Sequence, residues 1–307
     1  MIVCAGEALI DMLPRRSEGG EDAFAPHAGG AVFNTAVALG RLGAPVGFLS
    51  GLSTDLFGAR LEAALLASGV DASLCVRSGR PTTLAFVTLE EGQASYAFYD
   101  EGTALRTLAP GDLPPLPGAA TALFLGGISL VFEPCAAAFE ALAEREAGRR
   151  AIVVDPNVRP GFVVDEAGYR ARIDRILRLA DVVKVSDEDL RWLMGDGDTT
   201  ALAAQLVSRG PSVVVVTAGA DGAAAHTGEG TVAVPSERAD VVDTVGAGDT
   251  FNAGLVASLH AAGHLTPGLP GLTEEPLRDA LRLGARVAAV TVSRAGANPP
   301  WRHEIEG

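Results

Sequence analysis

The sequence has few cysteines, few aromatic residues and no long uninterrupted apolar segment. Its three cysteines, Cys4, Cys75 and Cys135, stand far apart in apolar surroundings, so neither a disulfide framework nor a zinc-binding pattern is present. No apolar run approaches the roughly 18 residues that a membrane-spanning helix needs. The amino terminus enters a predicted strand without a basic leader. We therefore expect a cytoplasmic protein with no membrane partner.

Positive charge is also scarce. The chain has 24 lysines and arginines against 38 aspartates and glutamates, a formal net charge of -14 and an isoelectric point near 4.8. A nucleic-acid partner is excluded on this ground, because its phosphates must be met by lysine and arginine. An anionic substrate would need a pocket that is locally positive.

Apolar segments, by contrast, are plentiful and regularly spaced. With 307 residues, 48% of them hydrophobic, the chain can bury about three quarters of its unfolded surface in one large α/β domain or two modest ones. The predicted strands are residues 2–10, 46–49, 122–125, 151–154, 182–185 and 213–216, and the predicted helices are residues 31–42, 57–65, 135–145, 169–179 and 201–208. This alternation predicts a mostly parallel sheet covered by helices on both faces.

Two predicted hairpins interrupt the alternation. Residues 83–89 and 95–99 flank a polar turn at residues 90–93 and favour a small antiparallel sheet that forms a lid over the main sheet. Residues 223–225 and 231–234 form the second predicted hairpin. Both hairpins therefore lie outside the repeated βα units that form the parallel sheet.

A glycine-rich turn from Gly246 to Asp249 precedes a predicted helix. The apolar residues between Phe251 and Leu259 have helical spacing, so the helix is expected to begin near Gly248. The first backbone N–H groups of a helix lack partners, and its dipole is positive there, so an anion is stabilised. A lysine-based phosphate loop is excluded, because Asp249 follows the second glycine. That carboxylate could act as a base or could only cap the helix.

Unusual polar residues follow most of the predicted strands. Asp11 follows the first strand, and residues 155–159, 184–189 and 217–222 follow three later ones. Each group alone could be a turn or a helix cap. In open α/β sheets, however, ligands bind outside the carboxyl ends of the strands. Their shared location therefore predicts one ligand site.

A second glycine turn, Gly29-Gly30, precedes the predicted helix that begins at residue 31. Asn34 lies one turn into that helix, where asparagine is unfavourable. Asn34 could hydrogen-bond its own backbone, or it could face a ligand. Together with Asp11 it would supply donors and acceptors suited to a neutral polyhydroxylated ligand.

The two glycine turns carry a resemblance to a known family. Gly29-Gly30 through Asn34 to Gly43, and residues 243–251, resemble the signatures of the ribokinase-like family of carbohydrate kinases, and the match runs nearly end to end. The resemblance implies an α/β three-layer fold with a mostly parallel sheet flanked by helices. It also implies a single kinase domain over residues 1–307, with a small β lid formed from roughly residues 12–26 and 72–104.

The resemblance implies ATP-dependent transfer of the γ-phosphoryl group to a sugar hydroxyl. Asp249 would take the hydroxyl proton, and Gly246, Ala247 and Gly248 would present backbone N–H groups to the phosphate, since phosphoryl transfer depends on positioning and charge stabilisation. The implied substrate-binding residues are Asp11, Gly29, Gly30, Asn34, Phe98 and Arg159. The implied nucleotide-binding residues are Lys184, Ser186, Thr217, Gly219, Gly222 and Asn298.

The family also implies cations and a possible assembly. Mg²⁺ is expected because a polyphosphate donor needs its charge neutralised. The family often has Asn-x-x-Glu where this chain has Ser186 to Asp189, so Asp189 is the candidate metal contact, through water. Residues 294–299 are similar to a loop that helps to bind a monovalent cation in some relatives, which implies K⁺. A homodimer could form through the strands of the β lid.

The identity of the sugar rests on shorter segments. Residues 30–35, 50–58 and 155–160 look most like those of bacterial fructokinases, which favours conversion of fructose to fructose 6-phosphate. The ending at residues 298–302 resembles ribokinase endings, so ribose and 2-keto-3-deoxygluconate stay open as substrates. A nucleoside kinase, such as one for adenosine, and a non-catalytic sugar-binding regulatory protein are the remaining alternatives.

Overall fold

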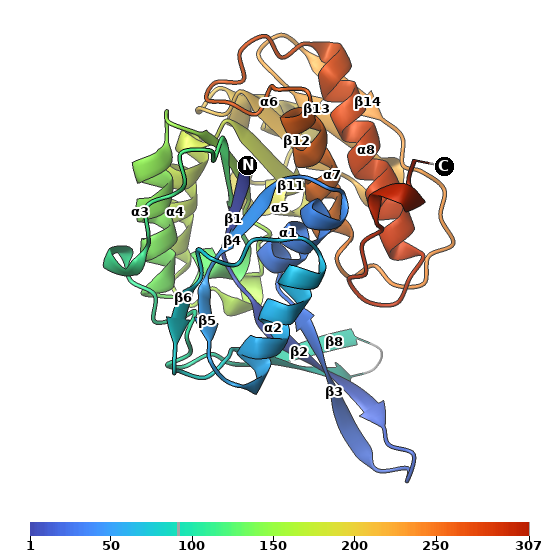
Figure 1. Cartoon of the computed structure of the whole chain (residues 1–307). Coiled ribbons are helices and arrows are strands. Elements are labelled where there is room, and N and C mark those ends of the chain that lie inside the picture. The colour runs from blue at the N-terminus through green and yellow to red at the C-terminus, as the bar shows by residue number, and fades with distance from the viewer. Residues whose placement is uncertain (91–92, 307) are drawn as a thin grey trace.

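The centre of the molecule is a large sheet with helices packed on both faces (Figure 1). The computed structural model describes residues 1–90 and 93–306, with the backbone alone for residues 88–90 and 93–96. Over these residues eight strands lie in the order β14 (Thr231–Val234), β13 (Ala223–His226), β12 (Val213–Thr217), β11 (Val182–Ser186), β10 (Ala151–Asp155), β9 (Ala122–Gly126), β1 (Ile2–Ala5) and β4 (Val46–Leu49). The strands from β12 to β4 are parallel, and β13 and β14 are antiparallel additions at one edge.

Each face of the large sheet contributes its side chains to a separate hydrophobic cluster. In β1, Ile2 and Cys4 belong to one cluster, and Val3 and Ala5 to the other, as the alternation of side chains along a strand requires. The first cluster is covered by α1 (Ala31–Arg41), α2 (Leu56–Ala67), α7 (Ala247–Ala261) and α8 (Glu274–Val292). The second is covered by α3 (Cys135–Glu146), α4 (Glu166–Leu179), α5 (Asp187–Met194) and α6 (Thr199–Val207). The predicted three-layer α/β fold is confirmed.

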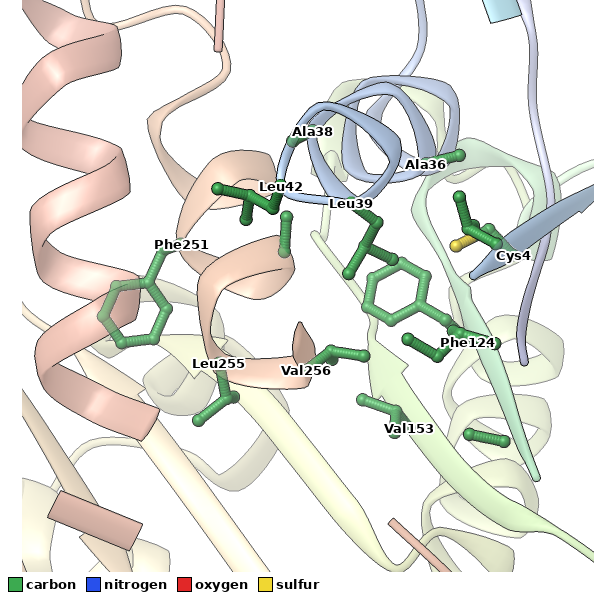
Figure 2. Close-up of a cluster of buried hydrophobic side chains, with 14 of the residues drawn as sticks. Cys4, Ala36, Ala38, Leu39, Leu42, Phe124, Val153, Phe251, Leu255 and Val256 are labelled. Carbon is green, nitrogen blue, oxygen red and sulfur yellow. The ribbon is translucent and has the colours of Figure 1, made fainter. Parts of the chain in front are cut away.

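Helices α1 and α7 are seated side by side on the sheet. Figure 2 shows Leu39 of α1 and Val256 of α7 gathered with Phe124 and Val153 of the strands beneath them. Burying each such side chain contributes about 1.5–3 kcal/mol relative to leaving it in water. This packing fixes both helices whose first turns face the candidate site.

A smaller sheet lies beside the large one, and its β2–β3 hairpin projects from the body of the molecule (Figure 1). Over the described residues its four strands are β3 (Asp22–Gly29), β2 (Leu9–Arg16), β7 (Leu84–Glu90) and β8 (Gln93–Tyr99), in that order. The predicted hairpin of residues 83–89 and 95–99 corresponds to β7 and β8, and residues 91–92 of its turn lie outside the described residues. A separate parallel pair joins β5 (Gly51–Ser53) to β6 (Val76–Ser78).

One predicted strand is wrong. Residues 2–10 form two strands, β1 and β2, which belong to different sheets and are separated by residues 6–8. All of these residues, including the charged Glu7, are buried, so no exposed position marks the change of direction. Gly6 allows the break, because a Cβ atom there would lie 2.5 Å from Cγ2 of Val32.

Helices α5 and α8 are additional to the predicted elements. The chain also has short 3-10 turns: η1 (Pro110–Asp112), η2 (Gly127–Leu130), η3 (Pro160–Phe162), η4 (Gly219–Asp221) and η5 (Arg302–Glu304). Among the residues that the structure describes, no helix is both long and apolar enough to pass through a bilayer.

Candidate active site

A cavity of about 410 Å³ opens at the carboxyl ends of the parallel strands, beside the small sheet. Residues predicted from the sequence that line it are Asp11, Gly30, Asn34, Phe98, Arg159, Lys184, Gly246, Ala247, Gly248 and Asp249. Further lining residues are Glu7, Leu9, Ala31, Gly127, Ile128, Asp155, Asn157, Phe162, Thr244 and Val245. The structure therefore brings residues from both glycine turns into one site.

The first turn of α7 is open towards this cavity. Its N-cap is Gly246, in the left-handed conformation with φ of 79°, and no side chain among the described residues caps the helix. A Cβ atom on Gly246 would lie 2.7 Å from the Cβ of Ala297, so glycine is needed for both conformation and space. The N–H of Ala247 donates to the carbonyl of Thr244 at 3.2 Å, and the other N–H groups of the turn and the positive end of the helix dipole form a site for an anion.

Asp249 does not act as the helix cap. Its carboxylate is buried, 8% exposed, and its Oδ2 accepts a hydrogen bond from Nδ2 of Asn34 at 2.9 Å. Burial raises the pKa of Asp249 to about 7, while the bond from Asn34 lowers it and the charge of Asp155 raises it. A carboxyl group with a pKa near neutral can both take and release a proton at working pH, which is what a general base needs.

The first turn of α1, in contrast, is filled by a carboxylate. Oε1 of Glu7 accepts hydrogen bonds from the backbone N–H groups of Ala31 at 2.9 Å and Val32 at 3.4 Å, and Oε2 accepts from Ser129 at 3.3 Å. Burial raises the pKa of Glu7, and these backbone bonds lower it. Of the two glycine turns at the cavity, only the one at α7 is therefore open to an anion.

The end of the cavity near the small sheet combines a carboxylate with aromatic rings. Asp11 lies on β2, and a Cβ atom on Gly29 would collide with its Oδ2, so Gly29 makes room for that carboxylate. Burial raises the pKa of Asp11 to about 6. The rings of Phe98 and Phe162 meet edge to face with centroids 4.6 Å apart. A ligand here would meet one acceptor group and an apolar wall.

Two cationic side chains, those of Lys184 and Arg159, line the cavity. Lys184, the only lysine in the sequence, is 5% exposed, and its Nζ lies 3.1 Å from Oδ2 of Asp155. The same nitrogen lies 3.1 Å from the position that a Cβ atom on Gly248 would take. The cation of Lys184 therefore lies directly against the open turn of α7.

Several predicted nucleotide-binding residues do not line the cavity. The side chain of Ser186 caps α5 by accepting from the N–H of Asp189 at 2.9 Å, and Thr217 donates to the carbonyl of Val185 at 3.4 Å. Asn298 is exposed and accepts from Arg41 at 2.9 Å. Their roles stay predictions.

The remaining predicted residues lie just beyond the strands. Gly219 and Gly222 bound the η4 turn after β12, and both have positive φ. Asp189 lies in the first turn of α5; burial and the nearby Asp155 raise its pKa. Within residues 1–90 and 93–306, no group of three or more histidine, cysteine, aspartate or glutamate side chains is arranged to hold a metal ion.

Sequence reasoning missed Glu7 and Phe162 as parts of the site, and it gave Asp155 no individual role. Glu7 binds Ser129, 122 residues away, and Phe162 meets Phe98 across the cavity mouth. Asp155 stood within a predicted strand-end segment, which was the only available signal. Contacts between distant segments leave no local pattern in a sequence.

An open helix N-terminus beside a carboxyl group whose pKa is near 7 suits the transfer of a phosphoryl group to a hydroxyl. The fold and the site therefore define an α/β kinase. The chain belongs to the pfkB family of carbohydrate kinases, whose family model matches residues 1–304. It is 53% identical over 280 residues to a fructokinase of Rhizobium leguminosarum bv. trifolii, covering 91% of this chain and 86% of the relative.

Solved structures agree with this membership. A fructokinase from Xylella fastidiosa with bound ATP superposes with a TM-score of 0.86 at 31% identity, over 96% of this chain and 93% of its own. A fructokinase from Vibrio cholerae O395, bound to fructose, ADP and calcium ion, gives a TM-score of 0.81 at 25% identity, over 96% and 94%. The chain is an ATP-dependent sugar kinase.

Proposed function

We propose that this kinase converts fructose to fructose 6-phosphate with ATP as the donor. The observation that carries the proposal is the juxtaposition of Asp249, with its pKa raised to about 7, and the open first turn of α7. The choice of fructose is supported by the 53% identity to a fructokinase. Asp11 and Asn34 supply polar groups near the acceptor, and the wall of Phe98 and Phe162 suits the C–H faces of a sugar.

In the proposed reaction a sugar hydroxyl gives its proton to the carboxylate of Asp249 as its oxygen bonds to the γ-phosphorus of ATP. The bond between that phosphorus and the β–γ bridging oxygen breaks, and ADP leaves with the bridging oxygen. Backbone N–H groups of the turn from Gly246 to Gly248 hold the equatorial oxygens of the phosphoryl group. The ammonium of Lys184 adds positive charge where negative charge builds up.

The residues present fit a metal ion that arrives with ATP. Mg²⁺ keeps several waters and binds through one or two carboxylates together with substrate phosphates, so it needs no cage of protein ligands. Asp189 would hold it through water, and the ion would neutralise phosphate charge. The remaining nucleotide contacts proposed are Ser186, Thr217, Gly219, Gly222 and Asn298.

A monovalent cation site is also proposed, next to the α7 turn. Asp243 joins this turn to the loop of residues 294–299, because its Oδ1 accepts from the N–H of Val245 at 3.0 Å and its Oδ2 from that of Gly296 at 2.8 Å. K⁺ bound between these two segments would steady the open turn.

The direct test of the proposed function is ADP release with MgATP and a panel of fructose, ribose, 2-keto-3-deoxygluconate, tagatose and adenosine. We expect fructose to have the highest kcat/KM, by about 10⁴-fold over acceptors that lack a hydroxyl group to which the site hydrogen-bonds. Preference for ribose or 2-keto-3-deoxygluconate would contradict the assignment of fructose. Absence of turnover with tight sugar binding would instead indicate a regulatory protein.

The pH dependence should report Asp249. Because the base must be ionised, kcat/KM is expected to fall as the pH drops below about 7, the pKa to which burial raises this carboxyl. The hydrogen bond from Asn34 lowers that pKa, so Asn34→Ala should move the acidic limb to higher pH. The measurement is kcat/KM for the sugar between about pH 5.5 and 9. An acidic limb that stays in place in Asn34→Ala would contradict the assignment.

We propose that the small sheet is the lid, and the homodimer through it stays a prediction, as does the cytoplasmic location. Phe24, Phe86 and Tyr99 form a row of edge-to-face rings on this sheet, with centroid separations of 5.0 and 5.4 Å. Phe24 and Tyr99 are 43% and 63% exposed. An exposed aromatic row supports a contact between copies of the chain.

A further inference from the structure

Three buried polar side chains from three different elements meet behind the open turn of α7. Oδ2 of Asp155, at the end of β10, receives Nζ of Lys184 from β11 at 3.1 Å and Nδ2 of Asn252 from α7 at 2.6 Å. The three residues are 3%, 5% and 1% exposed, respectively. Oδ1 of Asp155 also accepts from the N–H of Asn157 at 3.1 Å, so both carboxylate oxygens are held in place.

This group is a poor device for stabilising the fold. A buried ion pair contributes little or nothing compared with apolar residues of similar volume. Oδ1 of Asn252 is buried without a hydrogen-bond partner among the described residues, and such an atom costs about 1–3 kcal/mol. The arrangement is better explained by what it holds in place.

Asp155 connects the cation of the site to the helix that carries the base. Lys184 lies against the turn at Gly248, and Asn252 follows Asp249 by one turn of α7. With Asp155 as the common acceptor, the lysine and the helix cannot shift independently. The carboxylate also balances the lysine charge within a buried site before a phosphate arrives.

We propose that Asp155 is a positioning residue, which holds Lys184 directly and α7 through Asn252. In this way it keeps the ammonium of Lys184 and the carboxylate of Asp249 beside the same phosphoryl group. The inference rests on the roles proposed above for Asp249 and Lys184. Asp155 itself need not touch the sugar. Its effect on the reaction passes through the other two side chains.

The first test is a double-mutant cycle with Asp155→Asn, Lys184→Met and the double variant. Asp155→Asn is expected to lower kcat/KM for ATP by about 10- to 100-fold, as loss of a supporting hydrogen-bond partner does. Lys184→Met should lower it more. Since the effect that Asp155 exerts through Lys184 can be lost only once, the loss in the double variant should be clearly smaller than the product of the two single losses. Multiplicative losses would overturn the proposal.

The pH profile separates positioning and charge from general damage. The groups that act on the Asp249 carboxyl are the amide of Asn34, the charges of Asp155 and Glu7, which raise its pKa, and the charge of Lys184, which lowers it. Asp155→Asn should therefore move the acidic limb to lower pH, and Lys184→Met should move it to higher pH. Limbs that stay in place would show that both residues are merely structural.

Asp174→Asn is the matched control, because Asp174 forms an exposed ion pair with Arg178 on α4. It should leave kcat, KM and the pH profile unchanged, and thermal melting should show that every variant is folded. If Asp155→Asn does not fold, Asn252→Ala tests the α7 arm alone. Asn252→Ala should lower kcat. MgATP should still protect Lys184 from modification by trinitrobenzenesulfonate, which peptide mass spectrometry measures. An unchanged kcat would refute the proposed link from Asp155 to α7.

The two proposals fail in different ways. A failure of the parent protein to phosphorylate fructose would refute the proposed function, and an Asp249→Asn variant as active as the parent would refute the proposed base. An inactive Asp249→Asn variant together with multiplicative effects of Asp155→Asn and Lys184→Met would refute only the positioning role.

Discussion

Asp249→Asn is expected to lower kcat by roughly 10²- to 10⁴-fold while sugar affinity is largely kept. Asparagine has the same shape and can still accept the hydrogen bond that Nδ2 of Asn34 now gives to Oδ2 at 2.9 Å. It cannot take the proton of the sugar hydroxyl, so the attacking oxygen would have to lose its proton without help. Initial rates of ADP release at saturating MgATP and fructose measure the effect, and calorimetry measures sugar binding.

The exposed Asp174→Asn variant serves as the control here as well, since it makes the same chemical change away from the cavity. A kcat for Asp249→Asn close to that of the parent would mean that another group takes the proton. Loss of sugar binding together with kcat would mean that the carboxylate serves to bind the acceptor.

Gly254→Leu is expected to destabilise the protein by about 3 kcal/mol or more, because overpacking between rigid elements is costly. A Cβ atom at Gly254 of α7 would lie 2.7 Å from Cα and 2.8 Å from N of Gly284 on α8. These are backbone atoms, so relief requires the helices to separate. Even Gly254→Ala should destabilise, although alanine is favoured over glycine in a helix by about 1 kcal/mol. Urea unfolding measures both effects.

Gly118→Ala provides the comparison, because a Cβ atom there would meet nothing within 4 Å. It should leave the unfolding midpoint nearly unchanged. A Gly254→Ala protein more stable than the parent would show that α7 and α8 can separate freely. In that case the open turn of α7 would not be held by its contact with α8.

The sequence predicted the layered fold well because each strand of the large sheet is a short apolar run with its own turn signals. It did not predict α8, because small residues on its packed face weaken the amphipathic pattern that marks a helix. Leu277 and Leu281 are buried, but Arg278 and Arg282 follow them directly on the outer side. Small residues such as Gly284 make up much of the packed face.

Within the site, the predictable parts were those encoded by adjacent residues. The turn from Gly246 to Asp249 and the position of Asn34 follow from local patterns. The contact of Asn252 with Asp155 joins segments 97 residues apart, and only the order of the strands brings them together. Glu7 lay inside a predicted strand that is in fact a junction between two sheets, so its capping role was hidden.

The junction between the two sheets at residues 6–8 bears on whether phosphate is transferred to the sugar or to water. Strands β2 and β3 of the small sheet join the body through residues 6–8 and where β3 runs into α1, so Asp11 belongs to the sheet proposed as the lid and Asp249 belongs to α7. Tilting the small sheet away would leave ATP beside a base with no acceptor hydroxyl in range. In the proposed lid role, wasteful hydrolysis of ATP would then be limited by geometry, because closure of the small sheet over a bound sugar would complete the reacting arrangement.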